Sequence, residues 1–424
     1  MQKNIGNLVI VSLVLLTPVV WLVFPPINDG RATFVRAYAA EMIGSVNIVL
    51  MSGSLFLAAR PKWAEPYFGG LDKMYQTHRR LAVSAFLLIF VHLLVAPISV
   101  TNLRLGNYLA MIAFLGIVTI VLLTLAPRIP ILSRLTNGSY DGWKRVHRYM
   151  GIFFTLGYLH SLTIKGLSAF IAINWVQIFF IIGVVSYLYT ELFSGIFRKK
   201  LPYSVETVKH LNGNTTEVTL RPKDRRANHR AAGQFLFVHF PGDKVMNESH
   251  PFTISSGPRE EHIRLTIKAS GDFTRYLFHN LRPGMDAVVE GAYGLFDYQR
   301  GGGKQIWIAG GIGITPFLSF MRDAETFKHE VDFYYTVRTR EEALFLDEIE
   351  AAAQRHKSFH PHVRFSIENG SLRTDDILSD AGGDVSGHHV YMCGPLGMVQ
   401  AFAEQFKQKG VPPDHIHYEE FNFR

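Results

Sequence analysis

The chain has 424 residues, a length that predicts about two or three domains. Its formal net charge is +8, but many basic residues flank apolar segments and no lysine- or arginine-rich tail is present, so the charge does not indicate nucleic-acid binding. Cys393 is the only cysteine, which excludes an intrachain disulfide, and the lack of a CxxCH motif excludes covalently attached haem.

Hydrophobicity divides the chain into two halves. The mean hydropathy is +0.12, and nearly all the long apolar runs lie within residues 1–197, whereas residues 198–424 are typical of a soluble α/β protein. We therefore expect a membrane domain, 1–198, followed by soluble domains at 199–300 and 301–424.

A membrane-spanning helix needs about 20 mostly apolar residues. The segments that meet this condition are about 5–24, 36–59, 79–99, 106–127, 148–168 and 173–196. The first follows Lys3 and has the position of a signal peptide, but its apolar run is long and Phe24-Pro25-Pro26 is a poor cleavage site. We predict an uncleaved helix and a six-helix transmembrane bundle.

The distribution of Lys and Arg predicts the orientation of this bundle. With the N-terminus inside, the inner segments hold fourteen basic residues and the outer loops hold four. The inner residues are Lys3, Arg60, Lys62, Lys73, Arg79, Arg80, Arg128, Arg134, Lys144, Arg145, Arg148, Arg198, Lys199 and Lys200, and the outer ones are Arg31, Arg36, Arg104 and Lys165. This bias predicts a multi-pass protein of the cell (inner) membrane whose N-terminus and C-terminal half are cytoplasmic.

Only four of the 18 histidines precede residue 200: His78 and His92 in the third segment, and His147 and His160 in the fifth. Ionisable residues inside a bilayer are costly and usually functional, although packed, hydrogen-bonded histidines are the alternative. Steps of fourteen and thirteen residues rise about 21 Å and 19.5 Å along a helix. One metal cannot span either distance, so the pattern predicts two sites stacked across the bilayer.

Each site would take one histidine from each helix, as the two axial ligands of a haem iron. Both helices run from inside to outside, so His78 pairs with His147 near the cytoplasm and His92 pairs with His160 near the outer face. Zinc is the rival metal, but zinc sites need three or four clustered ligands.

The helical angles are uneven. At about 100° per residue the third-segment pair comes within about 40° of one face, whereas the fifth-segment pair differs by about 140°. We therefore expect the fifth helix to depart from regular geometry between its histidines, with Gly151 and Gly157 as candidate sites for a kink.

The second half contains two kinds of pattern. Short alternating runs in residues 200–300, such as 234–240 and 262–268, predict a small antiparallel β-barrel. Residues 304–424 alternate strand-like and helical stretches, which predicts an α/β domain with a parallel sheet.

A glycine-rich turn, Gly310-Gly-Ile-Gly-Ile-Thr-Pro316, follows the buried-strand run 305–309 and precedes an apolar helical stretch. Such a turn can bring backbone N–H groups to a phosphate, although a tight packing turn is the alternative because GxGxxG is not matched. The run 390–395 is a second strand that ends in a Gly-Pro break. Ligands bind at the carboxyl ends of such strands, so we expect a nucleotide site there.

Together these features resemble the NADPH oxidase and ferric reductase branch of the ferredoxin–NADP reductase superfamily, over nearly the whole chain. The histidine pairs match the branch's haem ligands, including the thirteen and twelve residues between them. The other motifs that carry the resemblance are His250-Pro-Phe-Thr-Ile-Ser255, Gly271-Asp-Phe-Thr274, Gly291-Ala-Tyr-Gly294, Gly310–Pro316 and Cys393-Gly-Pro395.

The resemblance implies FAD bound by His250, Pro251, Phe252, Thr253, Ser255, Lys268, Gly271, Thr274 and Phe423. Thr253 would lie near the reactive nitrogen of the flavin, and the 271–274 turn at the pyrophosphate. Phe423 would stack on the flavin, with Phe421 in reserve; ordinary strand core is the alternative for both.

The resemblance also implies a nicotinamide nucleotide bound by Gly310, Gly311, Gly313, Thr315, Pro316, Arg338, Arg340, Cys393, Gly394 and Pro395. Cys393 would lie near the nicotinamide. Arg338 or Arg340 could bind the ribose 2′-phosphate bidentately, which favours NADPH over NADH, or both could be solvated loop charges.

The function implied is an NAD(P)H oxidase or ferric-reductase-type oxidoreductase, with electrons passing from NADPH through FAD and two b-type haems to an outer acceptor. Oxygen, giving superoxide, is the first expectation, and ferric chelates or a quinone are the alternatives. Ala96 stands where the animal oxidases carry a further histidine, and the outer loops are short. Arg36 and Glu41 are candidate pathway groups, or else an interfacial anchor and a structural pair.

A transporter whose histidines relay protons is the alternative from another functional class. The sequence shows no EF-hand loop and no Pro-rich docking segment, so we expect activity without a protein activator. The partners expected are the small-molecule acceptor and membrane lipid, with no nucleic acid.

Overall fold

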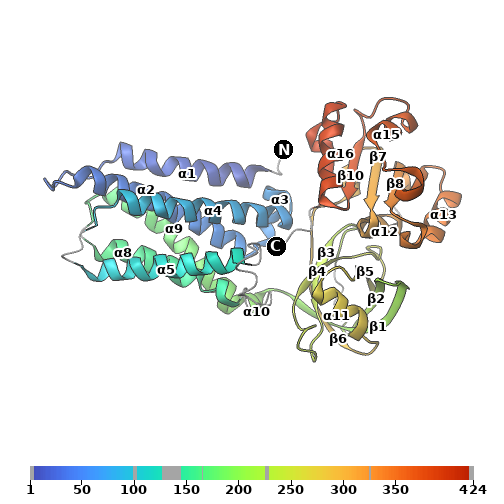
Figure 1. Cartoon of the computed structure of the whole chain (residues 1–424), viewed down its shortest axis with the longest axis horizontal. Coiled ribbons are helices and arrows are strands. Elements are labelled where there is room, and N and C mark those ends of the chain that lie inside the picture. Colours follow the sequence, from blue (N-terminus) through green and yellow to red (C-terminus); the bar gives the residue numbers. More distant parts are fainter. Residues whose placement is uncertain are drawn as a thin grey trace. The chain divides into compact units, whose positions relative to one another are not determined.

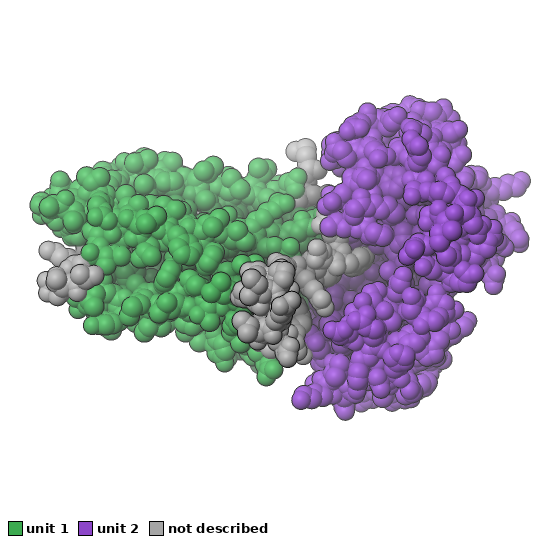
Figure 2. Space-filling model, in the orientation of Figure 1, with its two compact units in different colours: residues 1–197 green, residues 198–424 purple. Residues whose placement is uncertain are grey.

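The computed structural model describes residues 4–98, 103–126, 145–164, 166–224, 229–323 and 326–419. The chain divides into two compact units, residues 1–197 and 198–424 (Figure 2). The expected division of the two halves lies one residue further along.

Unit 1 is a bundle of long apolar helices that run alongside one another (Figure 1). The α-helices are α1 Ile5–Val23, α2 Phe34–Ala58, α3 Glu65–Phe68, α4 Leu71–Val95, α5 Leu105–Leu125, α8 Met150–Thr163, α9 Phe170–Leu188 and α10 Ser194–Phe197, with a π-helical turn η4, Tyr189–Phe193, after α9. Helix α2 packs against α1, α4 and α9, and α5 packs against α8.

The surface of unit 1 is apolar. Among the described residues, nearly all the exposed large hydrophobic side chains lie in this unit, and unit 2 exposes only Val245, Ile367 and Leu396. Soluble proteins rarely expose so much contiguous apolar surface. Within the part of the chain that the structure describes, five helices are long and apolar enough to cross a membrane: α1, α2, α4, α5 and the continuous stretch Phe170–Ile196.

Two of the expected segments differ from the helices found. The fifth, 148–168, contains α8, which has 14 residues and is shorter than a span requires. The third expected segment, 79–99, corresponds to α4, which begins at Leu71 instead of residue 79. Gly69 and Gly70 have φ angles of 85° and 124°, so the chain turns there and the helix starts in polar sequence.

The first half of unit 2 is an antiparallel barrel with strand order β4-β3-β6-β1-β2-β5. The strands are β1 Lys200–Asn212, β2 Thr215–Pro222, β3 Phe235–His239, β4 His250–Thr253, β5 Ile263–Lys268 and β6 Asp286–Tyr293, and helix α11, Asp272–Asn280, follows β5. A bridge between Ile254 and Leu265 joins the two end strands. The prediction of a small antiparallel barrel is confirmed.

The second half of unit 2 is a parallel sheet with strand order β11-β10-β7-β8-β9. The strands are β7 Lys304–Gly310, β8 Glu330–Val337, β9 Phe359–Phe365, β10 His389–Cys393 and β11 Ile416–Tyr418, and the helices are α12 Thr315–Met321, α13 Leu346–Arg355, α14 Ser366–Asn369, α15 Thr374–Asp380 and α16 Leu396–Gln408. Separate hydrophobic clusters, one around Trp307 and one around Phe406, support the sheet. The predicted parallel α/β domain is confirmed.

Candidate functional site

The glycine-rich turn lies at the carboxyl edge of the parallel sheet. Strand β7 leads into the 3-10 turn Gly311–Ile314 and then into α12. Strand β10 lies beside β7 with Ala309 opposite Cys393, so both strands end at the same edge. Strands β8 and β9 continue on one side of β7 and β10 and β11 on the other, which makes this edge the switch point where nucleotides bind in open α/β sheets.

The two turns at this edge touch through their backbones. A Cβ atom on Gly313 would lie 2.2 Å from the carbonyl oxygen of Cys393, and one on Gly310 would lie 2.8 Å from Met398 Cε. Gly311 differs, because its φ is +55° and nothing lies within 4 Å of its Cβ position. Thr315 is buried, and its hydroxyl donates to the carbonyl of Ile312 at 3.1 Å. The open side of the turn at Gly311 is the face that a nucleotide phosphate can approach.

Cys393 is buried at the end of β10. Burial and the nearby Glu419 carboxyl raise the pKa of its thiol well above the ordinary value. A Cβ on Gly294, just after β6, would lie 2.8 Å from Glu419 Oε1. Glu419 therefore lies between the ends of β6 and β10, directly before the tail. The predicted flavin-stacking residues Phe421 and Phe423 fall outside the described residues.

We expect Cys393 to react slowly with thiol reagents in the folded protein. Only the thiolate is nucleophilic, and the raised pKa together with burial keeps the protonated thiol inaccessible, so labelling at pH 7 should be more than about tenfold slower than for a free cysteine. A chromogenic disulfide reagent measures this, because the chain has a single cysteine. Between pH 7 and pH 9 the native rate should stay low while the rate in denaturant rises. Fast native labelling would contradict the burial.

The predicted flavin-binding segments are in contact within the barrel. The ring of His250, at the start of β4, stacks on Phe273 in the first turn of α11, with centroids 3.7 Å apart and planes at 25°. Thr274 Oγ1 accepts hydrogen bonds from the N–H groups of Ser270 and Gly271 at 3.0 Å and 2.9 Å. Lys268 ends β5 just before this turn. A fixed helix N-terminus with a nearby cation suits a diphosphate.

Ser255 lies behind this surface. It is fully buried, accepts a hydrogen bond from the Thr266 hydroxyl at 3.1 Å, and its carbonyl accepts one from Arg322 Nη1 at 2.6 Å. Next to it, Ser319 Oγ donates to the carbonyl of Ser256 at 2.8 Å. The segment that contains Ser255 thus attaches β4 to α12, the helix that follows the glycine turn.

The structure separates the two candidate arginines after β8. Arg340 pairs with both carboxylate oxygens of Glu368 at 3.0 Å and 2.9 Å and lies over the ring of Phe365. Arg338 is exposed, and within the described part of the chain its side chain has no hydrogen bond or ion pair. Arg338 is therefore the guanidinium available to a phosphate at this edge.

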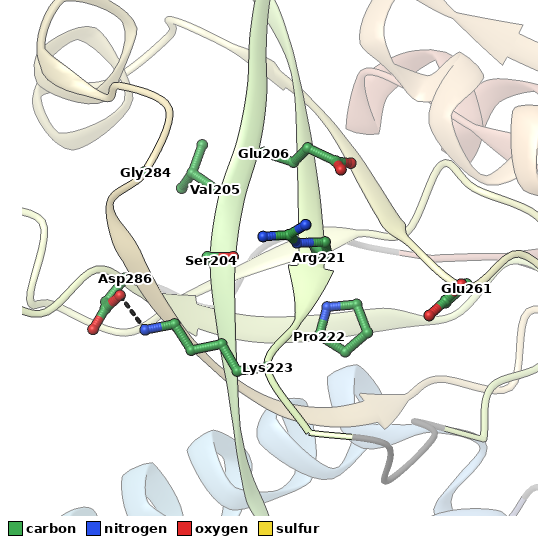
Figure 3. A pocket seen from close by; sticks show the side chains of 9 residues that line it. All are labelled: Ser204, Val205, Glu206, Arg221, Pro222, Lys223, Glu261, Gly284 and Asp286. Carbon is green, nitrogen blue, oxygen red and sulfur yellow. Dashed lines mark hydrogen bonds and ion pairs between the residues drawn. The ribbon is translucent and has the colours of Figure 1, made fainter.

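A hollow on the barrel surface lies away from these residues. It is lined by β1, β2 and the start of β6, where Lys223 and Asp286 form an ion pair (Figure 3). None of the predicted site residues lines it, and its walls carry charges of both signs from Glu206, Arg221 and Lys223. It is a charged surface depression apart from the predicted flavin-binding residues.

Comparison with known proteins agrees with this geometry. Residues 200–297 match the FAD-binding domain family, and residues 307–404 match the oxidoreductase NAD-binding domain family. The reductase component of propane 2-monooxygenase from Rhodococcus jostii (strain RHA1) is 27% identical over 248 residues, 54% of this chain and 66% of that protein. The carnitine monooxygenase reductase subunit of Acinetobacter pittii (strain PHEA-2) is 32% identical over 159 residues, 38% of this chain and 50% of that protein.

The chain thus spans about half to two thirds of the length of these curated relatives. A flavohemoglobin from Malassezia yamatoensis, solved with bound FAD and heme, has a TM-score of 0.50 at 16% identity, covering 96% of this chain and 98% of that one, which is a likeness of fold alone. The two domain matches and the site geometry define residues 198–424 as a flavin-dependent reductase module. Its FAD-binding domain followed by an oxidoreductase NAD-binding domain is an arrangement like that of the ferredoxin–NADP reductases.

The four histidines of unit 1 lie in the predicted pairs. The ring centroids of His78 and His147 are 6.4 Å apart, and those of His92 and His160 are also 6.4 Å apart. An imidazole nitrogen lies about 2.0 Å from a bound metal, and two such rings on opposite sides of one iron would have centroids about 6.3 Å apart. The spacing therefore fits one iron between the rings of each pair.

Three of the four rings are oriented by backbone carbonyls. Nδ1 lies 2.9 Å from the Ser54 oxygen in His78, 2.9 Å from the Ala40 oxygen in His92, and 3.0 Å from the Gly106 oxygen in His160. A carbonyl only accepts, so each Nδ1 carries the proton and each Nε2 lone pair remains available to a metal.

The fifth helix is irregular between its two histidines, as the angular analysis predicts. Residues 145–147 are helical, a turn occupies residues 148–149, and α8 begins at Met150. The predicted role of Gly151 and Gly157 is wrong, because both lie inside α8 beyond the turn. A Cβ on Gly151 would instead lie 2.3 Å from the ring of Tyr187, so this glycine permits close packing on α9. Arg148, in the turn, donates to Glu191 of η4 through Nε at 2.6 Å.

Each histidine pair offers two imidazole rings as donors. Among the residues that the structure describes, no group of three or more His, Cys, Asp or Glu side chains is placed to hold a metal ion.

Arg36 donates to the carbonyls of Val95 and Ala96 at 3.1 Å and 3.0 Å and so caps α4, and Glu41 accepts from the N–H of Leu167 at 2.8 Å. Both residues make structural contacts, although not with each other.

Sequence reasoning missed the residues that orient the rings. Ala40 and Ser54 act through backbone oxygens, which every residue type carries, so their identity gives little signal. The available signal is spacing: they are fourteen residues apart on α2, as His78 and His92 are on α4. Asn47 lies midway between Ala40 and Ser54, and its buried Oδ1 has no hydrogen-bond partner within the described residues.

Proposed function

We propose that this protein is a membrane-spanning reductase that moves electrons from cytoplasmic NADPH, through FAD and two b-type haems, to an acceptor at the outer face. The observation that carries the proposal is the arrangement of the two histidine pairs. In each pair the ring centroids lie 6.4 Å apart, and backbone carbonyls accept hydrogen bonds from Nδ1 of His78 and His92. A reductase module that worked without a membrane domain would not require paired histidine ligands.

Bound FAD accepts a hydride and releases electrons singly, and haem iron accepts one electron at a time. The chain's part is positioning. The turn at Gly311 binds the nucleotide phosphates, Thr253 lies at the end of the flavin strand, and buried Cys393 lies at the end of β10. Contacts between α12 and the segment after β4 hold the nucleotide turn and the flavin strand in a fixed relative position.

Oxygen is the acceptor proposed first, giving superoxide, because the resemblance to the oxidases extends to both histidine pairs. A ferric chelate is the second candidate, favoured by Ala96 at the position where the animal oxidases carry a histidine. We propose that unit 1 lies in the cell membrane with unit 2 in the cytoplasm, and that no protein activator is required. The excess of basic residues in the predicted inner segments supports this orientation.

The test uses the full-length protein purified in detergent and supplied with FAD. A reduced-minus-oxidised spectrum should show two bis-histidine haems per chain, and NADPH should drive superoxide formation that superoxide dismutase suppresses. Rapid ferric-chelate reduction under nitrogen without superoxide in air would establish the second acceptor. Protein that binds FAD but no haem would overturn the proposal and favour a histidine-relay transporter. Activity only after a partner is added would contradict independence from activators.

We expect Arg338 to set the preference for NADPH. In Arg338→Ala the KM for NADPH should rise about tenfold to a hundredfold, because a charge-assisted hydrogen bond to the 2′-phosphate is lost, while the KM for NADH should stay unchanged. Arg340→Ala is the matched control, since Arg340 already pairs with Glu368. Steady-state dye reduction with each nucleotide measures both. Equal effects on NADPH and NADH would contradict the assignment.

A further inference from the structure

The two histidine sites have nearly the same surroundings on α2. This helix is antiparallel to α4, so the carbonyl of Ser54 meets His78 and the carbonyl of Ala40 meets His92, each at 2.9 Å. Fourteen residues separate the members of each set, and the two contacts are therefore repeats of one arrangement. Ala40 and Ser54 are both buried.

The repeats differ in one atom. Ser54 carries a hydroxyl, and its Oγ lies 2.9 Å from His78 Nδ1, so this nitrogen faces two oxygen acceptors. The same Oγ lies 3.5 Å from the carbonyl of His78, toward which its own proton can point, leaving a lone pair for Nδ1–H. At the outer site Ala40 offers a methyl group where Ser54 offers the hydroxyl, and among the described residues His92 Nδ1 has the Ala40 carbonyl as its one acceptor.

We propose that this Ser54 hydroxyl makes the inner haem the more reducing of the two and so directs electrons outward. The inference rests on the proposed function. Hydrogen-bond acceptors at Nδ1–H increase the basicity of the imidazole, which stabilises the oxidised iron and lowers its midpoint potential. Two acceptors at His78 and one at His92 give an inner potential below the outer one. A single electron is redistributed between the two irons, and no bond or proton is exchanged.

The test is a spectroelectrochemical titration of both haems in the full-length holoprotein. Ser54→Ala should raise the lower of the two midpoint potentials and leave the higher one unchanged, which shifts the electron distribution between the haems toward the inner site by about fivefold, the value expected for one hydrogen bond. A separate variant, Ser54→Thr, keeps a hydroxyl and should have the same two midpoint potentials as the native protein. Ser52→Ala is the matched control, because the buried Ser52 hydroxyl donates to the carbonyl of Phe179 on α9 instead.

Ala40→Ser is the reciprocal variant. It supplies the missing hydroxyl to His92 and should lower the higher potential, so the Ala40→Ser/Ser54→Ala protein should have the order of its potentials reversed. A His160→Leu background, which leaves only the inner haem, assigns the lower potential. Unchanged potentials in Ser54→Ala, or an equal shift in Ser52→Ala, would overturn the inference with the haems intact. A wild-type protein without haem bands would instead overturn the proposed function.

Discussion

Replacing His160 with leucine should remove the outer haem and leave the inner one in place. Leucine keeps the apolar volume and the helix but provides no donor, and His92 alone gives the iron one axial ligand instead of two. Haem content should fall from two per chain to one. NADPH-driven reduction of the external acceptor should fall by more than about 100-fold, since even the loss of supporting contacts around a metal ligand costs about 10–100-fold.

The reductase module should be unaffected by this change, so NADPH-driven reduction of a soluble dye that takes electrons from the flavin should continue at the native rate. Asn174→Leu is the control for adding leucine to unit 1, because Asn174 lies exposed on α9 and, among the described residues, its side chain bonds to the carbonyl of Phe170 alone. Pyridine haemochrome analysis counts the haems. Two full haems in the His160→Leu protein would rule out His160 as a ligand.

Replacing Gly313 with valine should abolish nucleotide-driven flavin reduction. A Cβ at this position would lie 2.2 Å from the carbonyl oxygen of Cys393, and the obstacle is backbone, which cannot rotate away. The turn after β7 and the turn after β10 must then separate. Overpacking of this kind costs about 1–3 kcal/mol of folding free energy, and a displacement of about 1 Å at a reacting centre can cost about 100-fold in rate.

Stopped-flow reduction of the flavin by NADPH measures this effect, and thermal unfolding of the same protein separates misplacement from loss of fold. Gly303→Ala is the matched control, because Gly303 lies just before β7 and nothing is within 4 Å of its Cβ position. Its flavin should be reduced at the native rate. Native reduction in the Gly313→Val protein would mean that the contact between the two turns does not position the nucleotide.

The irregular helix that carries His147 and His160 shows what helical periodicity can and cannot predict. Counting at about 100° per residue predicts that His147 and His160 cannot share one side of a regular helix. The structure has the turn at residues 148–149, where Arg148 contacts Glu191 of η4. The need for a break follows from the spacing of the ligands. The contact made at the break joins Arg148 to a residue 43 positions away, which local sequence does not reveal.

The glycine turn gives a second example, within unit 2, of what sequence predicts and what only the fold reveals. The strand-turn-helix pattern at 305–321 predicts a nucleotide site, and the neighbouring Cys393-Gly-Pro395 break completes it, because carboxyl ends of adjacent parallel strands meet at one edge. The structural role of Ser255, by contrast, has no signal in the sequence. Its burial comes from packing against α12, which only the folded chain brings there.

The sequence by itself determined the division into an apolar and a more polar half, the barrel followed by a parallel sheet, and the two histidine pairs. These follow from hydrophobic period and from the rise of a helix, which are local properties of the chain. Tertiary structure alone decided that Arg340 pairs with Glu368 while Arg338 has no side-chain partner among the described residues, and that the Ser54 hydroxyl distinguishes the His78 site from the His92 site. Both depend on partners from distant segments. Those partners are a carboxylate and backbone oxygens, whose positions are set by packing and leave no periodic trace in the sequence.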